Sequence, residues 1–161
     1  MNSNRLVVNA SPIISLAKLG KADILPALFS ELVIPEGVVE EICSHRIIDS
    51  AVQWLQQKAK PFIKPVPVVP QIADWNLGRG ETDVISYAYL NKGFIVAIDD
   101  KPAKKCAELY GIKVNGTLSL IIKAKQHGII QEASPLLFGL KQNGFRISDS
   151  LLSKAQRLAN E

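Results

Sequence analysis

The chain has 161 residues, 47% hydrophobic and 21% charged, with a net charge of +4, which suits one globular domain over residues 1–161 and leaves binding to phosphate groups open. No apolar run reaches the roughly 18 residues of a membrane helix, and the first residues lack a signal-peptide pattern. Because no membrane helix is predicted, we expect no association with membranes. Cys43 and Cys106 form no CxxC pair, so we expect reduced thiols in a cytoplasmic protein.

Short apolar runs alternate with helical patterns along the chain. In order, the pattern predicts a strand at 6–8, helices at 12–19 and 22–29, a strand at 32–34, helices at 36–45, 50–59 and 81–91, a strand at 94–98, a helix at 103–110, a strand at 112–114 and a helix at 118–127. Strands that alternate with helices predict an α/β fold with a parallel sheet covered on both faces.

Turn and cap residues support this division. Ser11 before Pro12 predicts a helix start, and Gly20 predicts the end of the same helix. The segment 61–78 has four prolines within 61–70, which exclude a central strand or a helix in this segment, so we expect an extended connection along the surface or the sheet edge. Residues 134–161 carry two further helical patterns.

Polar and acidic residues follow the predicted strands or open the next helices. In an open parallel sheet, ligands bind at the carboxyl ends of the strands. Residues in such positions are Asn9, Glu40, Glu41, Glu81, Asp83, Asp99 and Asp100. The acidic residues also have structural alternatives. They can interact favourably with the positive end of a helix dipole, form a solvated helix face or cap a helix.

Clustered carboxylates repel one another unless a cation neutralises them, and clusters of oxygen ligands select Mg²⁺ or Mn²⁺. Such ions cleave phosphodiesters by activating water and stabilising the leaving oxygen. Glu41 lies three residues after Val38 and seven after Ile34, so we expect it, rather than Glu40, to share the helix face that packs toward the sheet.

Basic residues flank these acids. Lys101, Lys104 and Lys105 follow the Asp pair, and Arg79 precedes Glu81. They could bind phosphates beside a metal site, or they could form a solvated helix face. The sequence shows no aromatic platform for single-stranded bases.

Several segments in the same order resemble the PIN domain family, in its DUF3368 branch. They are VVNASPIISLAKLG, LVIPEGVVEEI, GRGETDVISYA, VAIDDKPAKKCAELYGIKVNGTLSLIIKAKQHGII and LLFGLKQNGFRIS. The resemblance implies a three-layer α/β/α sandwich with a central, mostly parallel sheet and acids around one or two divalent metals. Many PIN domains are ribonucleases, including toxins of toxin–antitoxin pairs, so the resemblance also implies an RNA substrate, a small antitoxin partner and homo-oligomers.

The resemblance also assigns positions in this chain. The first acidic position falls on Asn9, the second on Glu41, the third on Asp83 with Glu81 beside it, and the fourth on Asp100 with Asp99 beside it. We therefore expect these six residues at the metal, with Glu41, Asp83 and Asp100 catalytic. Expected substrate contacts are Ser11, Arg79, Lys101, Lys104 and Lys105.

Asn9 departs from the family, which has Asp at this position. An amide keeps one acceptor oxygen but lacks the negative charge, so metal affinity should be lower. The sequence thus supports two hypotheses: a Mg²⁺- or Mn²⁺-dependent endoribonuclease, or a catalytically degenerate PIN-like domain that binds RNA or a protein.

Overall fold

The centre of the fold is a five-stranded sheet in the order β3-β2-β1-β4-β5, and every strand pair is parallel. The structure is a computed structural model that describes residues 4–44 and 49–161. The strands are β1 (Arg5–Val8), β2 (Glu31–Pro35), β3 (Ile63–Lys64), β4 (Ile95–Ala97) and β5 (Val114–Asn115). This arrangement confirms the predicted α/β class with a parallel sheet.

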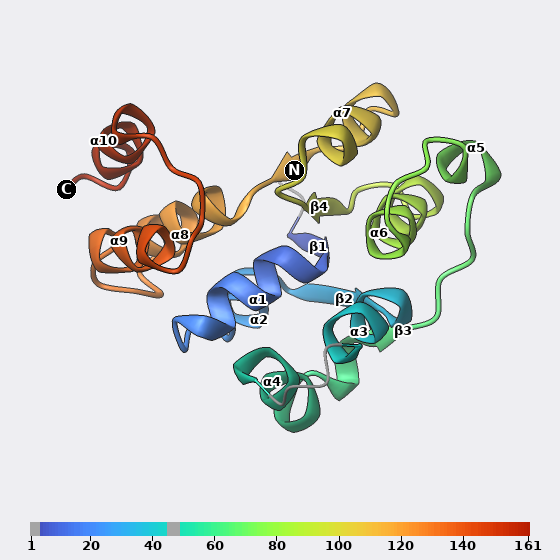
Figure 1. Ribbon diagram of the computed structural model, residues 1–161, viewed down its shortest axis with the longest axis horizontal. Coiled ribbons are helices and arrows are strands. Elements are labelled where there is room, and N and C mark those ends of the chain that lie inside the picture. The colour runs from blue at the N-terminus through green and yellow to red at the C-terminus, as the bar shows by residue number, and fades with distance from the viewer. Residues whose placement is uncertain (1–3, 45–48) are drawn as a thin grey trace.

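Helices cover both faces of the sheet, as Figure 1 shows. One layer contains α1 (Ala10–Lys18), α2 (Ile24–Leu28), α3 (Glu36–Cys43), α4 (Ser50–Lys58) and α8 (Thr117–Gln126). The opposite layer contains α5 (Pro70–Ala73), α6 (Arg79–Leu90) and α7 (Lys101–Leu109). Helices α9 (Ser134–Gln142) and α10 (Asp149–Leu158) pack against α8, and a short 3₁₀ turn, η1, spans Lys60–Phe62. The result is the expected three-layer sandwich.

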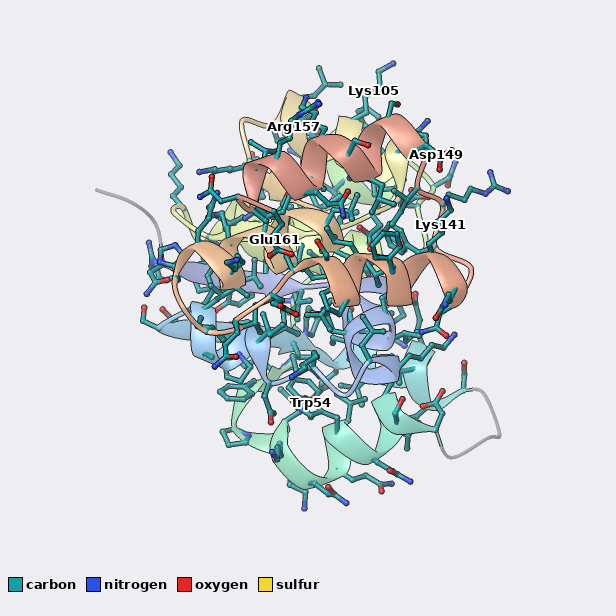
Figure 2. The ribbon with its side chains drawn as sticks, turned by 90° about the vertical axis from the view of Figure 1, so that its left-hand side faces the viewer. Trp54, Lys105, Lys141, Asp149, Arg157 and Glu161 are labelled. Atoms are coloured by element: carbon teal, nitrogen blue, oxygen red, sulfur yellow. The ribbon has the colours of Figure 1, made fainter. Side chains whose placement is uncertain are left out.

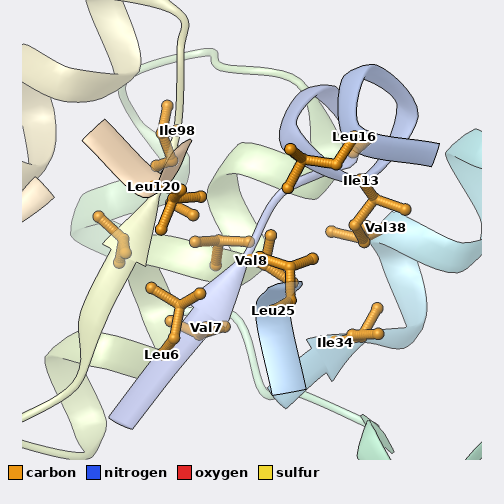
Figure 3. Packing of buried hydrophobic residues seen from close by; sticks show 14 of the residues in the cluster. Leu6, Val7, Val8, Ile13, Leu16, Leu25, Ile34, Val38, Ile98 and Leu120 are labelled. Carbon is orange, nitrogen blue, oxygen red and sulfur yellow. The ribbon is translucent and has the colours of Figure 1, made fainter. Parts of the chain in front are cut away.

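The core forms around β1, which lies in the middle of the sheet. Leu6, Val7 and Val8 are fully buried, because helices cover both faces of this strand. Figure 3 shows Ile13 and Leu16 of α1 lying near this strand. Successive side chains of a strand point to opposite faces, so a continuous apolar run fits only a strand buried on both sides.

Two local predictions were wrong. Helix α1 begins at Ala10 with Asn9 at its N-cap, so Ser11 lies inside the helix. The proline-rich segment contains the helix α5, which begins at Pro70, because the first turn of a helix needs no N–H from proline. The same segment also supplies β3, which lies at the sheet edge as expected. His45, predicted at the end of a helix, lies outside the described residues.

None of the helices within residues 4–44 and 49–161 is long and apolar enough to cross a membrane. Cys43 is exposed and Cys106 is buried, and both are free thiols.

Glu161 caps the N-terminus of α9 by accepting hydrogen bonds from backbone N–H groups at the start of this helix. Its Oε2 accepts from Ala133 N–H at 2.7 Å and from Lys125 Nζ at 3.1 Å, and its Oε1 accepts from Ser134 N–H at 2.8 Å. Figure 2 shows the labelled Glu161 beside the last two helices of the chain, α9 and α10. Hydrogen bonds from the Ser134 side chain and then from the two backbone amides lower the pKa of Glu161 from 4.5 to about 2.

We expect Glu161→Gln to lower the melting temperature by about 2–4 °C at pH 7, the effect of losing a charged helix cap worth about 1 kcal/mol in a chain of this size. Because the pKa of Glu161 is lowered on folding, its stabilisation is complete above pH 4.5 and disappears as the pH falls toward 2. Thermal melts of both proteins should therefore converge between pH 5 and pH 2. Glu132→Gln, at an exposed neighbouring position, is the matched control. An equal shift in the control would contradict the capping role.

Candidate functional site

The strand order reverses between β1 and β4, and we call the sheet edge at the carboxyl ends of these two strands the crevice, because open parallel sheets bind ligands there. From β1 the chain moves to β2 on one side, and it later returns to β4 on the other side. Asn9 directly follows β1, and its N–H donates to Ala97 O at 3.0 Å. Asp99 lies two residues beyond β4. In parallel sheets this reversal of strand order is the usual place for ligands.

The side chain of Asn9 is 3% exposed and only half satisfied. Its Nδ2 donates to Glu81 Oε1 at 3.2 Å. Its Oδ1 is buried and has no hydrogen-bond partner among the residues that the structure describes. A buried acceptor without a donor is unfavourable, so this oxygen marks a place where a cation or another donor would be stabilising.

Glu41 of α3 points at the same space from the other side. Gly80 N–H, in the first turn of α6, donates to Glu41 Oε1 at 2.6 Å. A Cβ on Gly80 would stand 2.8 Å from Asn9 Oδ1 and 2.9 Å from Glu41 Oε2. The two acceptor oxygens therefore converge over a glycine, and a larger residue there would enter the space between them.

Glu81 completes this group at the start of α6. A Cβ on Gly78 would collide with Glu81 Oε2 and would stand 3.6 Å from Glu41 Oε1. The positive end of the α6 dipole favours carboxylates at this position. Asn9, Glu41 and Glu81 thus lie together around Gly78 and Gly80.

Asp99 and Asp100 differ in their surroundings. Asp99 Oδ1 accepts from Thr117 N–H at 2.8 Å, and its Oδ2 accepts from Thr117 Oγ1 at 2.6 Å and from Ser11 Oγ at 3.0 Å. Asp100 is exposed and caps α7 by accepting from Ala103 N–H at 3.0 Å. The structure therefore places Asp99, rather than Asp100, beside Ser11 at the crevice.

Asp83 is 4% exposed and lies between α3 and α6. A Cβ on Gly37 would overlap Asp83 Oδ2. Burial raises the pKa of Asp83, the Arg79 guanidinium opposes this shift, and the nearby Glu40 carboxylate adds to it. Asp83 is therefore turned toward Gly37 of α3, while Glu81 of the same helix contacts Asn9.

The basic residues occupy different positions. Arg79 forms an ion pair with Glu40, and both side chains are exposed, so the pair adds little stability. Lys104 Nζ is 3.4 Å from the point where a Cβ on Gly116 would stand, and Asp99 Oδ1 is 3.1 Å from the same point. Lys101 and Lys104 line one hollow together with Asp99, and Lys105 is exposed on α7.

Two residues of the crevice were missed. Thr117 is fully buried and donates twice to Asp99, and it directly precedes the helix predicted at 118–127. Asn115 ends β5 and is 7% exposed, and its Nδ2 has no hydrogen-bond partner within residues 4–44 and 49–161. The polar run that follows the last apolar strand, Asn115 to Thr117, was the available signal.

The side-chain atoms of this site that could bind a metal ion are all oxygen atoms, which suits a hard divalent cation. Among residues 4–44 and 49–161, no group of three or more His, Cys, Asp or Glu side chains is close enough to hold a metal ion. The fit to a cation therefore rests on the unpartnered Asn9 Oδ1 facing Glu41 Oε2 across Gly80.

The family described as DUF3368: PIN domain matches residues 5–161. No curated protein and no solved structure matches the chain. The family match covers all five strands and confirms the resemblance noted from the sequence segments.

Proposed function

We propose that this chain, which belongs to the DUF3368 family of PIN domains, is a metal-dependent endoribonuclease. The family supports a nuclease-like fold, and PIN domains generally depend on divalent metals. The observation that carries the proposal is the buried Asn9 Oδ1 without a donor, which converges with Glu41 Oε2 at the carboxyl end of the central strand.

Asn9 and Glu41 would hold Mg²⁺ or Mn²⁺, with Glu81 beside them. When bound, the cation would activate water and stabilise the leaving oxygen of a phosphodiester. Asp99 accepts hydrogen bonds from Thr117 and Ser11, and these orient its carboxylate at the crevice. Lys104 beside Asp99 supplies a positive charge that would attract the substrate phosphate.

We expect the purified protein to cleave a 5′-labelled single-stranded RNA in the presence of Mn²⁺ and to lose this activity completely in EDTA. Denaturing gels would measure both rates. Glu41→Gln removes one expected ligand and should lower the rate at least about a hundredfold, which also controls for contaminating nucleases. Undiminished cleavage by Glu41→Gln, or in EDTA, would contradict the proposal.

A second candidate function is binding of RNA or a protein without cleavage. The observation that favours it is the hydrogen bond from Asn9 Nδ2 to Glu81 Oε1. This bond stabilises the Glu81 carboxylate without a cation. In this case the RNA of the assay above would bind and remain uncut at every Mn²⁺ concentration.

A toxin role with a small antitoxin partner, and self-association, are finer proposals that the family supports. Light scattering behind a sizing column measures self-association directly. Co-purification with the product of an adjacent small gene would test the antitoxin partner.

A further inference from the structure

A hollow of about 610 Å³ runs between α7, α8 and α10, away from the space around Gly80. Its apolar lining comes from two helices and the segment between α9 and α10: Leu118, Ile122, Phe145, Leu151 and Leu158. Leu151 is 41% exposed and Leu158 is 52% exposed, so large apolar side chains of α10 face solvent here. We call this hollow the α8–α10 groove.

The rim of the α8–α10 groove is basic. Lys101 and Lys104 of α7, Arg146 and Lys154 line it from different elements. Asp99 is the single acidic residue among the lining residues. The groove therefore combines an apolar floor with four positive charges, which complements a chain that carries flat apolar groups and regularly spaced negative charges.

The α8–α10 groove shares one residue, Asp99, with the crevice. Asp99, which Ser11 and Thr117 hold at the crevice, is also a lining residue of the groove. Lys104 Nζ and Asp99 Oδ1 lie near the same point above Gly116. A polymer whose phosphate lies at Asp99 could therefore continue directly into the groove.

We propose that the α8–α10 groove binds the segment of single-stranded RNA that flanks the scissile phosphate. This inference rests on the proposed ribonuclease function. Phe145 is half-buried and lines the groove, so its ring would stack on a base, while the exposed Arg146 and Lys154 would contact phosphates. The aliphatic floor would also suit an acidic amphipathic helix, but the continuity with Asp99 and Lys104 favours RNA.

The test measures binding in EDTA by fluorescence anisotropy, with a fluorescein-labelled 12-nucleotide single-stranded RNA. The double variant Arg146→Gln, Lys154→Gln should bind about tenfold more weakly at 100 mM salt. Its slope of log Kd against log salt should fall by about 0.7 for each lost phosphate contact. Both side chains are exposed, so these changes should leave the fold intact.

The matched control removes two positive charges elsewhere, at Lys21 and Lys92, which line other hollows. Phe145→Leu should weaken binding about tenfold, and Phe138→Leu, at an exposed aromatic residue of α9, should not. A single-stranded DNA probe of the same sequence tests whether the groove prefers RNA or binds any single-stranded nucleic acid. Tighter binding of DNA would overturn the assignment to RNA.

Equal losses in the Lys21 and Lys92 control, or unchanged binding in the double variant, would overturn the groove assignment. So would binding of an acidic amphipathic helical peptide by a protein that does not bind the RNA. Because binding is read without metal, absence of Mn²⁺-dependent cleavage would count against the proposed function and not against the groove.

Discussion

Asn9→Asp should raise the affinity for Mn²⁺ at least about tenfold and lower the melting temperature of the metal-free protein by at least about 3 °C. A tenfold gain in affinity corresponds to about 1.4 kcal/mol of binding free energy. The attraction between a carboxylate and a divalent cation a few ångströms away near a protein surface is larger than this. The loss of stability follows because Asn9 Nδ2 donates to Glu81 Oε1 at 3.2 Å, and a second carboxylate would repel Glu81.

The measurements are thermal melts in EDTA and in Mn²⁺, together with RNA cleavage at saturating Mn²⁺. Mn²⁺ should restore the stability that the substitution removes. An active wild-type site should cleave at nearly the rate of the variant, whereas cleavage by the variant alone would favour the degenerate alternative. Asn143→Asp, at an exposed position, controls for the added charge. Equal melting temperatures of Asn9→Asp and wild type in EDTA would contradict the described contact.

Asp99→Asn should reduce RNA cleavage at least about a hundredfold, while Asp100→Asn should change it less than about threefold. The two residues are adjacent and lose the same charge, so each variant controls for the other. Asp99 accepts three hydrogen bonds at the crevice, whereas Asp100 caps α7 on the surface. Asparagine is also a good N-cap, so Asp100→Asn should keep the helix intact.

Single-turnover cleavage rates in Mn²⁺ measure the difference between the two variants. A larger loss in Asp100→Asn than in Asp99→Asn would show that the carboxylate at the surface is the catalytic one. It would then contradict the role of Asp99, which accepts from Ser11 and Thr117, in cleavage.

The sequence predicted the sheet well where strands are buried on both faces. The apolar runs that became β1, β2 and β4 are continuous because neither face of these strands meets water. The two-residue strand β3 was not predicted as a strand, because prolines flank it and an edge strand needs hydrogen bonds on one side only. The start of α1 was misplaced because both Asn9 and Ser11 are good N-cap residues.

For the candidate site, the sequence predicted which segments meet but not which atoms face one another. Asn9 follows β1, and the structure places Glu41 of α3 and Glu81 of α6 beside it. Asp99 and Asp100 are adjacent and identical, so the sequence alone does not show which side chain points to the crevice. In the structure Asp99 contacts Ser11 and Thr117, whereas Asp100 caps α7. Arg146 and Lys154 reach the α8–α10 groove only through packing of α10 on α8, which spacing along the chain does not reveal.

The most direct test of a metal site at the end of β1 is a calorimetric titration of the wild-type protein and Glu41→Gln with Mn²⁺ at pH 7. We expect saturable binding to the wild type that is weakened at least about tenfold in Glu41→Gln, because Glu41 Oε2 and the unpartnered Asn9 Oδ1 face the same space. Equal affinity in the two proteins, or no saturable binding to the wild type, would contradict the account.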